Sequence, residues 1–417
     1  MKIRARNLIY FQLFLSIFLN VLTTNFALPG SIAYLGDLIN LVALYLLRNK
    51  LRRMLRFSKI KAFCFPLLIL SVSLLIGIIV NIVNPLYVLW GIRNNFRFFL
   101  FATLCIAAFE KEDEEKLFNI LFWIYNLSFV LALIQFFVLG LDQDFLGGVF
   151  GTQGGGNGRL NVLMVIVFSY NLSQYLDKKC SFIKVVYIML SSLIIAVFAE
   201  LKFYYIETAL IIVAVALFSK PSRKKFIIFL SGIVAVYAGL RLLEKIDPYT
   251  FSIVTNFDKI VEYGNMESGG YNISRLSAFS TINKLFFKDN LLYLLFGYGL
   301  GNCDTSKVSL FNSEFYQING SLHYSWFSHQ QWFLEGGYMA IVLLVLFMVC
   351  MCLYVYKYRQ QLKESNRNYL TVFSYTMYIL VFVNCIYNNS IRLEMAYITF
   401  ACLAIVPNLI ARSTMTD

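Results

Sequence analysis

The chain has 417 residues, of which 59% are hydrophobic and only 14% are charged. Soluble domains carry roughly 25% charged residues, so this composition excludes an ordinary soluble protein and favours one embedded in a membrane. The formal net charge of +13 alone would suit a nucleic-acid-binding protein, but the cations gather between long apolar segments, which argues for another origin.

Twelve apolar segments could cross a bilayer, because a spanning helix needs about 20 mostly apolar residues. We therefore predict an all-α, polytopic integral membrane protein. The first apolar run continues to Leu28 without a convincing cleavage site, so we interpret it as a spanning helix and not as a signal peptide. The predicted spans are 8–28, 30–47, 62–83, 86–109, 117–140, 159–176, 182–200, 203–219, 226–242, 328–353, 369–387 and 393–411.

The distribution of lysine and arginine predicts the orientation of these spans. With the N-terminus in the cytoplasm, the inner segments hold 24 of the 36 Lys and Arg residues. Cytoplasmic loops of membrane proteins carry such an excess. Topology therefore accounts for the basic balance without a nucleic-acid partner, and both termini are expected in the cytoplasm.

Two of the predicted outer segments are longer than turns. Residues 141–158 form a glycine-rich loop, and residues 243–327 form one long outer loop. The chain then divides into nine spans in residues 1–242, the long loop, and three spans in residues 328–417. No inner segment has comparable length, so we expect recognition or chemistry on the outer face.

Within the long loop, the segment Asn272–Leu292 is predicted to form an amphipathic helix, with Asn272 as a possible N-cap. Arg275 falls on the apolar side of this helix. Its guanidinium would either reach lipid headgroups or clamp a phosphate in a bidentate manner. The following Gly297–Gly301 segment predicts a tight turn that needs positive φ. It lacks the strand–helix context of a dinucleotide-binding fingerprint.

The only two histidines, His323 and His329, precede an apolar helix that also carries Glu335. A histidine near the outer membrane surface can act as a general base on a sugar hydroxyl. The alternative for His329 is an interfacial polar residue beside Trp326 in the aromatic belt. His323 is the weaker candidate for the base.

Cations also occur inside or beside the predicted spans. Arg93 and Arg97 lie four residues apart on one helix face. Two like charges within the membrane should face a cavity that binds anions, unless backbone carbonyls or acids such as Asp37 and Glu207 satisfy them.

Two further cations lie in outer turns. Lys202 is the cation of the turn between the seventh and eighth spans. It would either bind the same anion as the other cations or form an ion pair with Glu200. Arg159 follows the flexible glycines of the 154–158 segment, at the start of a helix.

In this order, these features resemble the O-antigen polymerase/O-antigen ligase family, and most closely its Wzy-type repeat-unit polymerases. Ser274-Arg275, Gly297–Gly301 and the stretch from His329 through Glu335-Gly336-Gly337 carry the resemblance. Lys202 stands where the family has a basic residue, often arginine, and the 155–159 loop matches loosely. The lysine at 202 and the short spacing from His329 to Gly337 favour a polymerase over a ligase.

The resemblance implies a GT-C-like glycosyltransferase in the bacterial inner membrane. It would polymerise undecaprenyl-diphosphate-linked repeat units into O-antigen, as part of lipopolysaccharide, or into capsular polysaccharide, on the outer face. It also implies a chain-length regulator and a flippase as partners. No nucleotide sugar or other cofactor is expected, because the lipid diphosphate is already activated. No metal is expected either, because the outer segments contain no cluster of aspartates. The expected catalytic residues are His329 as base, Glu335 as second choice, and Arg275; the expected substrate-binding residues are Arg159, Lys202, Arg93 and Arg97.

Two other functions fit the same sequence. An O-antigen ligase would transfer finished polysaccharide to lipid A-core. A flippase or secondary transporter would move the lipid-linked oligosaccharide across the membrane. Transporters of this size often contain internal repeats, whereas the two halves of this chain show no convincing similarity.

Overall fold

The computed structural model describes residues 4–57, 61–219, 223–265, 272–306 and 308–416. Within these ranges the chain is helical and contains no β-strand, which confirms the predicted all-α class. Lys2, Lys59 and Lys220, which were counted among the inner cations, lie outside the described residues. The long helices are α1 (Ala5–Thr24), α2 (Leu35–Phe57), α3 (Lys61–Val80), α4 (Pro85–Ala108), α5 (Asp113–Phe137), α6 (Gly156–Leu176), α7 (Phe182–Phe198), α8 (Tyr204–Phe218), α9 (Arg223–Ile246), α15 (Ser328–Glu364), α16 (Asn368–Tyr387) and α17 (Met395–Thr416).

Each predicted span corresponds to one of these helices, although α2 and α15 continue well past their predicted ends. In the described ranges, seven helices are long and apolar enough to cross a membrane, which makes this a membrane protein. They are α1, residues 30–54 around α2, α5, α9, α15, α16 and α17. Ile69–Val80 of α3, α7 and α8 are apolar but shorter, and α4 is interrupted by the polar stretch from Arg93 to Arg97.

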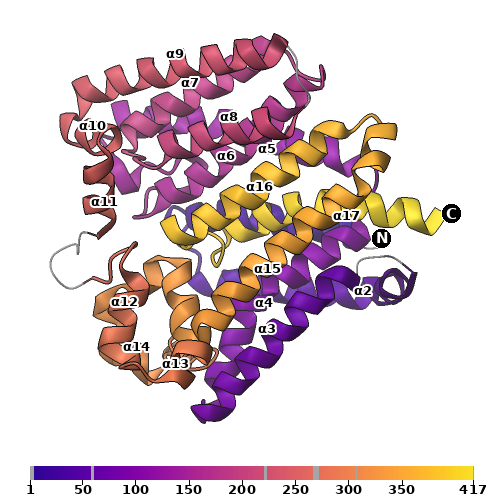
Figure 1. Ribbon diagram of the computed structural model, residues 1–417, viewed down its shortest axis with the longest axis vertical. Helices are drawn as coiled ribbons and strands as arrows, with labels where there is room; N and C mark the ends of the chain where they lie inside the picture. The colour runs from indigo at the N-terminus through magenta and orange to yellow at the C-terminus, as the bar shows by residue number, and fades with distance from the viewer. Residues whose placement is uncertain (1–3, 58–60, 220–222, 266–271, 307, 417) are drawn as a thin grey trace.

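The core of the bundle lies around α16 and α17. Helix α17 packs against α1, α2, α4, α6, α15 and α16, and α16 packs against α6, α8 and α15. In Figure 1 these two helices cross the middle of the molecule, between α5–α9 on one side and α2–α4 on the other. The outer helices expose large apolar side chains such as Trp123, Ile183 and Leu217. Such side chains suit a lipid environment, in which helices satisfy their own backbone hydrogen bonds.

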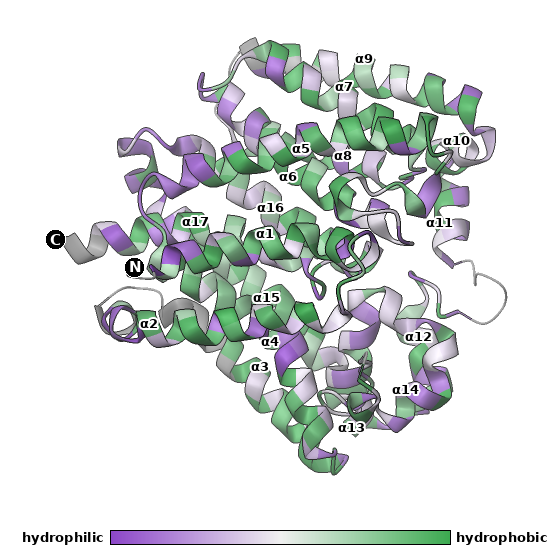
Figure 2. Cartoon of the chain, turned by 180° about the vertical axis from the view of Figure 1, so that it is seen from behind, coloured by the Kyte–Doolittle hydropathy of each residue, from purple (hydrophilic) through white to green (hydrophobic). Residues whose placement is uncertain are grey.

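The two ends of the bundle differ in content. Both termini lie near one end, and the helices of the long loop, α11 (Phe257–Asn265) to α14 (Glu314–Asn319), lie at the other (Figure 1). Figure 2 shows that hydrophilic residues gather at these two ends, while the helices between them are largely hydrophobic. The N-terminal ends of α6, α15 and α17 therefore meet at the end that carries the loop.

The long loop is built from short helices, and the predicted continuous helix over Asn272–Leu292 is wrong. Helix α12 spans only Ala278–Ile282, a π-helical turn follows over residues 283–287, and α13 spans Leu291–Phe296. Lys288 and Asp289 between them are left-handed, with φ of 50° and 59°. A left-handed pair ends a helix, so the helical stretch stops before α13. At its other end α12 begins only at Ala278, so Arg275 precedes the helix and does not lie on a helix face.

Side chains of α15 explain why the segment before α12 is not helical. Gln330 Nε2 donates to the carbonyl oxygens of Ile273 and Ser274 at 3.1 and 3.0 Å, and His329 Nε2 lies 2.9 Å from the carbonyl oxygen of Arg275. These carbonyls are thereby satisfied by side chains instead of by the amides four residues later.

The predicted turn at Gly297–Gly301 is confirmed, since all three glycines have positive φ. It docks against a kink in α15 at Gly337, where φ is 60° and ψ is −159°. The kink frees the carbonyls of Leu334 and Glu335, which accept hydrogen bonds from the amides of Tyr298 (2.8 Å) and Gly299 (3.0 Å). The glycines thus join the loop to α15 by backbone hydrogen bonds.

Candidate functional site

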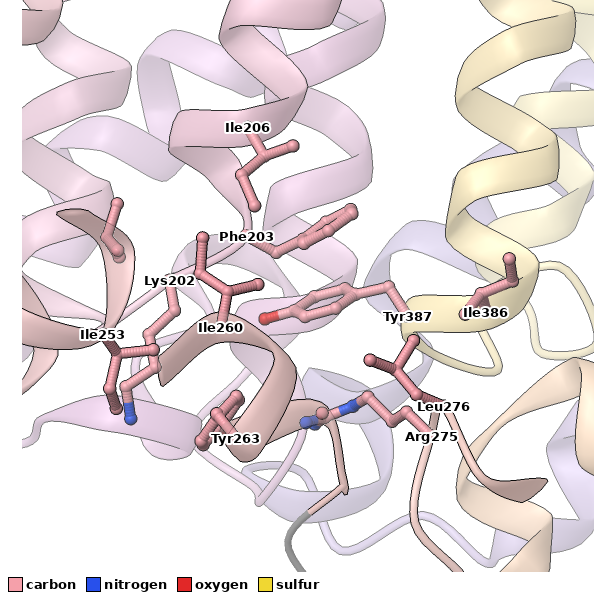
Figure 3. A pocket seen from close by; sticks show the side chains of 12 residues that line it. Lys202, Phe203, Ile206, Ile253, Ile260, Tyr263, Arg275, Leu276, Ile386 and Tyr387 are labelled. Carbon is pink, nitrogen blue, oxygen red and sulfur yellow. The ribbon is translucent and has the colours of Figure 1, made fainter. Parts of the chain in front are cut away.

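Lys202 and Arg275 lie in one small pocket between the long loop and the ends of α8 and α16 (Figure 3). The cavity measures about 110 Å³, and its wall is otherwise apolar or aromatic. We call it the aromatic pocket. Its lining residues are Lys202, Phe203, Ile206, Ile253, Val254, Ile260, Tyr263, Gly264, Arg275, Leu276, Ile386 and Tyr387.

Aromatic rings hold both cations of this pocket. The Arg275 guanidinium lies 4.6 Å from the ring of Phe327, 5.3 Å from Tyr263 and 5.4 Å from Tyr387. The Lys202 ammonium lies 4.9 Å from the same Tyr263 ring. Cations over ring faces are stabilised by the quadrupole of the ring without being neutralised.

Neither cation forms an ion pair with the carboxylates that the structure describes. Glu200, the partner suggested by sequence for Lys202, instead accepts a hydrogen bond from Gln143 at 2.8 Å. The Arg275 Nε is buried and has no hydrogen-bond partner in the described structure. The pocket therefore contains two cations that no described carboxylate neutralises, although the surface of the cavity itself is apolar.

His329 holds the chain that carries Arg275, and its side chain is only 6% exposed. Its Nε2 lies 2.9 Å from the Arg275 carbonyl oxygen, and its Nδ1 lies 3.2 Å from the carbonyl oxygen of Cys385. Carbonyl oxygens only accept hydrogen bonds, so both ring nitrogens face acceptors. In this conformation His329 links α15, α16 and the loop, and a role as base requires that one of these contacts be released.

A second and larger cavity lies on the other side of the α15 N-terminus. It measures about 460 Å³, within the roughly 300–1,000 Å³ usual for ligand sites. We call it the arginine cavity because four arginines line it: Arg93, Arg97, Arg159 and Arg392. Its other lining residues are Leu19, Asn20, Thr23, Gly30, Ala33, Tyr34, Trp90, Asn94, Gln153, Asp304, Thr305, Ser306, Ser325, Gln331, Asn389, Leu393 and Glu394.

Three of the four arginines have a carboxylate partner. Arg93 donates to Asp37 at 2.7 Å, which agrees with one of the partners suggested by sequence. The other suggested acid, Glu207, instead accepts hydrogen bonds from two buried asparagines within the bundle. Two more ion pairs join Arg97 to Glu394 at 3.7 Å and Arg392 to Asp304 at 3.3 Å.

The fourth arginine, Arg159, is in the first turn of α6 and forms no ion pair with a described carboxylate. Its Nε is buried without a hydrogen-bond partner in the described structure. Helix α6 begins after Gly155, which is left-handed with φ of 80°, and no acidic residue occupies its first turn. The partial positive charge of the helix N-terminus therefore adds to that of Arg159.

Arginines surround Glu394 in the arginine cavity and act on its pKa. Burial alone would raise the pKa of Glu394, but Arg97 and Arg159 more than offset this effect and lower the pKa below its ordinary value. Asp304 is buried and accepts hydrogen bonds from Asn94 at 2.8 Å and from Gln331 at 2.9 Å. It thereby connects the long loop to α4 and α15.

The first turn of α15 connects the two cavities. His329 and Gln330 bind the backbone around Arg275 in the aromatic pocket, and Gln331 binds Asp304 in the arginine cavity. The seven predicted site residues therefore do not form one cluster. Arg275 and Lys202 share the aromatic pocket, Arg93, Arg97 and Arg159 share the arginine cavity, and His329 lies between the two groups.

Glu335 and His323 lie apart from both cations of the aromatic pocket. Glu335 is buried one turn along α15, where Asn95 and Gln331 each place an amide nitrogen 3.4 Å from its carboxylate. His323, and not His329, stacks on Trp326, with ring centroids 4.0 Å apart.

Sequence reasoning missed the residues that complete each site. Arg392, Asp304 and Glu394 line the arginine cavity, and Tyr263 lies against both cations of the aromatic pocket. The sequence carried a signal for Arg392, because it lies in a predicted outer turn between two predicted spans, where Lys and Arg are expected to be rare. No local pattern marks Tyr263, since its role depends on how α11 folds back.

The chain matches no protein-family model, and no curated protein matches it.

Proposed function

We propose that this protein is a membrane glycosyltransferase that polymerises lipid-diphosphate-linked oligosaccharide units on the outer face of the bacterial inner membrane. The observation that carries the proposal is the aromatic pocket, in which Lys202 and Arg275 are present without carboxylate partners among the described residues. Undecaprenyl-diphosphate-linked glycans for O-antigen or capsule are the substrates that the sequence resemblance suggests.

The composition of the pocket suits the diphosphate of a lipid. Its apolar wall would accept the first isoprene units next to the headgroup, and its two cations would bind the phosphates. Arginine presents a planar fork of donors that matches phosphate oxygens. A carboxylate in the pocket would have repelled such a ligand.

The proposed reaction needs little more than positioned charge. A hydroxyl oxygen of the acceptor glycan forms a bond to the anomeric carbon of the donor glycan. The bond from that carbon to the diphosphate oxygen breaks, and its electron pair leaves with the lipid diphosphate. Lys202 and Arg275 would stabilise the negative charge that develops on this leaving group, while a base takes the hydroxyl proton.

His329 remains the residue we propose for that base, and its position between the cavities supports a second task. Because its Nε2 contacts the Arg275 carbonyl oxygen, His329 also positions Arg275. Glu335 is the alternative base, although its side chain is only 1% exposed and lies beside Gln331. The acceptor glycan would approach from the arginine cavity, which opens beside the same turn of α15.

All twelve long helices would cross the membrane, with the termini in the cytoplasm and the long loop outside, in a GT-C-like arrangement. The shared location of both termini at one end of the bundle supports an even number of crossings. A flippase would supply the lipid-linked units, and a chain-length regulator would act on the product.

A strain that lacks the gene tests this function directly. The lipid-linked glycans of that strain are extracted and resolved on a gel, and a membrane-impermeant oxidant labels the sugars that face outward. We expect single repeat units that are labelled from outside, and a return of long chains when the gene is restored.

Each competing function gives a different product in that strain. Long chains that stay on the undecaprenyl lipid would identify a ligase. Single units that the oxidant cannot reach would identify a transporter. Either result would overturn the proposed polymerase.

A further inference from the structure

We infer that the arginine cavity is a site for an acidic sugar, so that the glycan used by this protein carries a carboxylate-bearing residue. This inference rests on the proposed function, since it names the class of glycan that the enzyme would take. It concerns a cavity that lies apart from the aromatic pocket and contains none of that pocket's residues.

The charges of the cavity leave one cation over. Asp37, Glu394 and Asp304 each form an ion pair with one arginine; Arg159 has no ion pair of its own with a described carboxylate, although its charge also acts on Glu394. The N-terminus of α6 adds further positive character beside Arg159. A cavity with an excess of positive charge favours an anionic ligand.

Unused donors point in the same direction. The Nε groups of Arg97, Arg159 and Arg392 are buried, and none has a hydrogen-bond partner in the described structure. The side chains of Arg97 and Arg392 are only 7% and 8% exposed. Buried polar groups in native proteins are nearly always satisfied, and a carboxylate can accept hydrogen bonds from several guanidinium groups at once.

The remaining wall suits the hydroxyl groups of a sugar and not a lipid chain. Five side-chain amides line the cavity, and amides both donate and accept hydrogen bonds. They belong to Asn20, Asn94, Gln153, Gln331 and Asn389. Two aromatic residues, Tyr34 and Trp90, also line the cavity. The aromatic pocket, in contrast, has no amide side chain in its wall.

A binding experiment on the purified full-length protein in detergent tests the inference. The probes are tetragalacturonate as acidic glycan, maltotetraose as neutral glycan, and farnesyl diphosphate as lipid diphosphate, each measured by isothermal titration calorimetry. We expect tetragalacturonate to bind at least about tenfold more tightly than maltotetraose, with an affinity that falls as salt is added.

Variants assign the binding to a cavity. Arg159→Gln is expected to weaken tetragalacturonate binding about tenfold, or about 1.4 kcal/mol, whereas Arg159→Lys should retain most of it. Neither variant should change the affinity for farnesyl diphosphate. Lys202→Gln should weaken the binding of farnesyl diphosphate and leave that of tetragalacturonate unchanged. Lys284 is an exposed cation of the long loop, and Lys284→Gln should change the affinity for neither ligand.

Three results would overturn the inference. The first is equal binding of maltotetraose and tetragalacturonate, and the second is no binding of tetragalacturonate. The third is displacement of tetragalacturonate by farnesyl diphosphate with the same dependence on Arg159, which would assign the cavity to a second lipid diphosphate. Failure of the polymerase proposal would be seen separately, in the glycans of the deletion strain, and would leave these binding results readable.

Discussion

The two cavities hold their cations in opposite ways. In the aromatic pocket, rings surround Arg275 and Lys202, and no described carboxylate pairs with them. In the arginine cavity, three of four arginines are paired with Asp37, Glu394 or Asp304. A ring face does not neutralise the charge of a cation, so that charge can still attract a ligand. In an ion pair, a carboxylate of the protein neutralises much of it.

This difference predicts a division of labour. The aromatic pocket should matter for the leaving group, where a full charge develops during transfer. The arginine cavity should matter for folding and for recognition of a glycan, because its ion pairs join α2, α4, the long loop and the start of α17. Substitutions in the two regions should therefore affect different measurements.

The largest effect is expected from Asp304→Ala. Asp304 is buried and pairs with Arg392, and removal of one partner of a buried pair costs about 3–5 kcal/mol because the other charge is left uncompensated. Thermal unfolding in detergent should show a clearly lower midpoint. Asp258→Ala, at an exposed position of α11, is the matched control and should change the midpoint little. Equal midpoints for both variants would show that the cavity contributes nothing to stability.

Arg275→Ala should reduce activity and leave stability nearly unchanged. Loss of this cation is expected to slow chain elongation at least roughly 100-fold, as for other groups that stabilise developing charge. The unfolding midpoint should stay close to that of the native protein, because Arg275 forms no ion pair with a described carboxylate. Polysaccharide ladders from the complemented deletion strain, normalised to protein amount, measure the effect. Normal ladders would remove Arg275 from the site.

His329→Ala tests the link between the regions. If His329 positions Arg275 as well as acting as base, farnesyl diphosphate should bind about tenfold more weakly, since a hydrogen bond contributes about 0.5–1.5 kcal/mol, and elongation should stop. His323→Ala is the control, because His323 stacks on Trp326 away from Arg275. Unchanged binding with lost transfer would reduce His329 to a base alone, and full activity would exclude both tasks.

The smallest effect is expected from Gly337→Ala. At φ of 60°, a Cβ atom would meet the backbone of Leu294 and Leu295 at 2.5 Å, so strain of about 1–3 kcal/mol should lower the unfolding midpoint. Gly154→Ala is the matched control, because its Cβ would have no neighbour within 4 Å. A stability of the Gly337 variant equal to that of the control would mean that the kink does not depend on glycine.

Composition and local pattern are enough to predict the membrane class and the position of the twelve long helices. Apolar segments of sufficient length leave few alternatives to helices in a bilayer, because each segment satisfies its own backbone hydrogen bonds. Local pattern also predicts the turn at Gly297–Gly301, since closely spaced glycines allow positive φ where other residues resist it. These features depend on composition and on neighbours along the chain.

The tertiary structure alone decided how the cations are grouped. Periodicity predicted a helix through Arg275, but Gln330 and His329, more than fifty residues away, take the carbonyls that such a helix would use. The pairing of Arg392 with Asp304 spans 88 residues. No local pattern contains such contacts, so only the packing of α15 between the loop and α16 separates the candidate residues into two cavities.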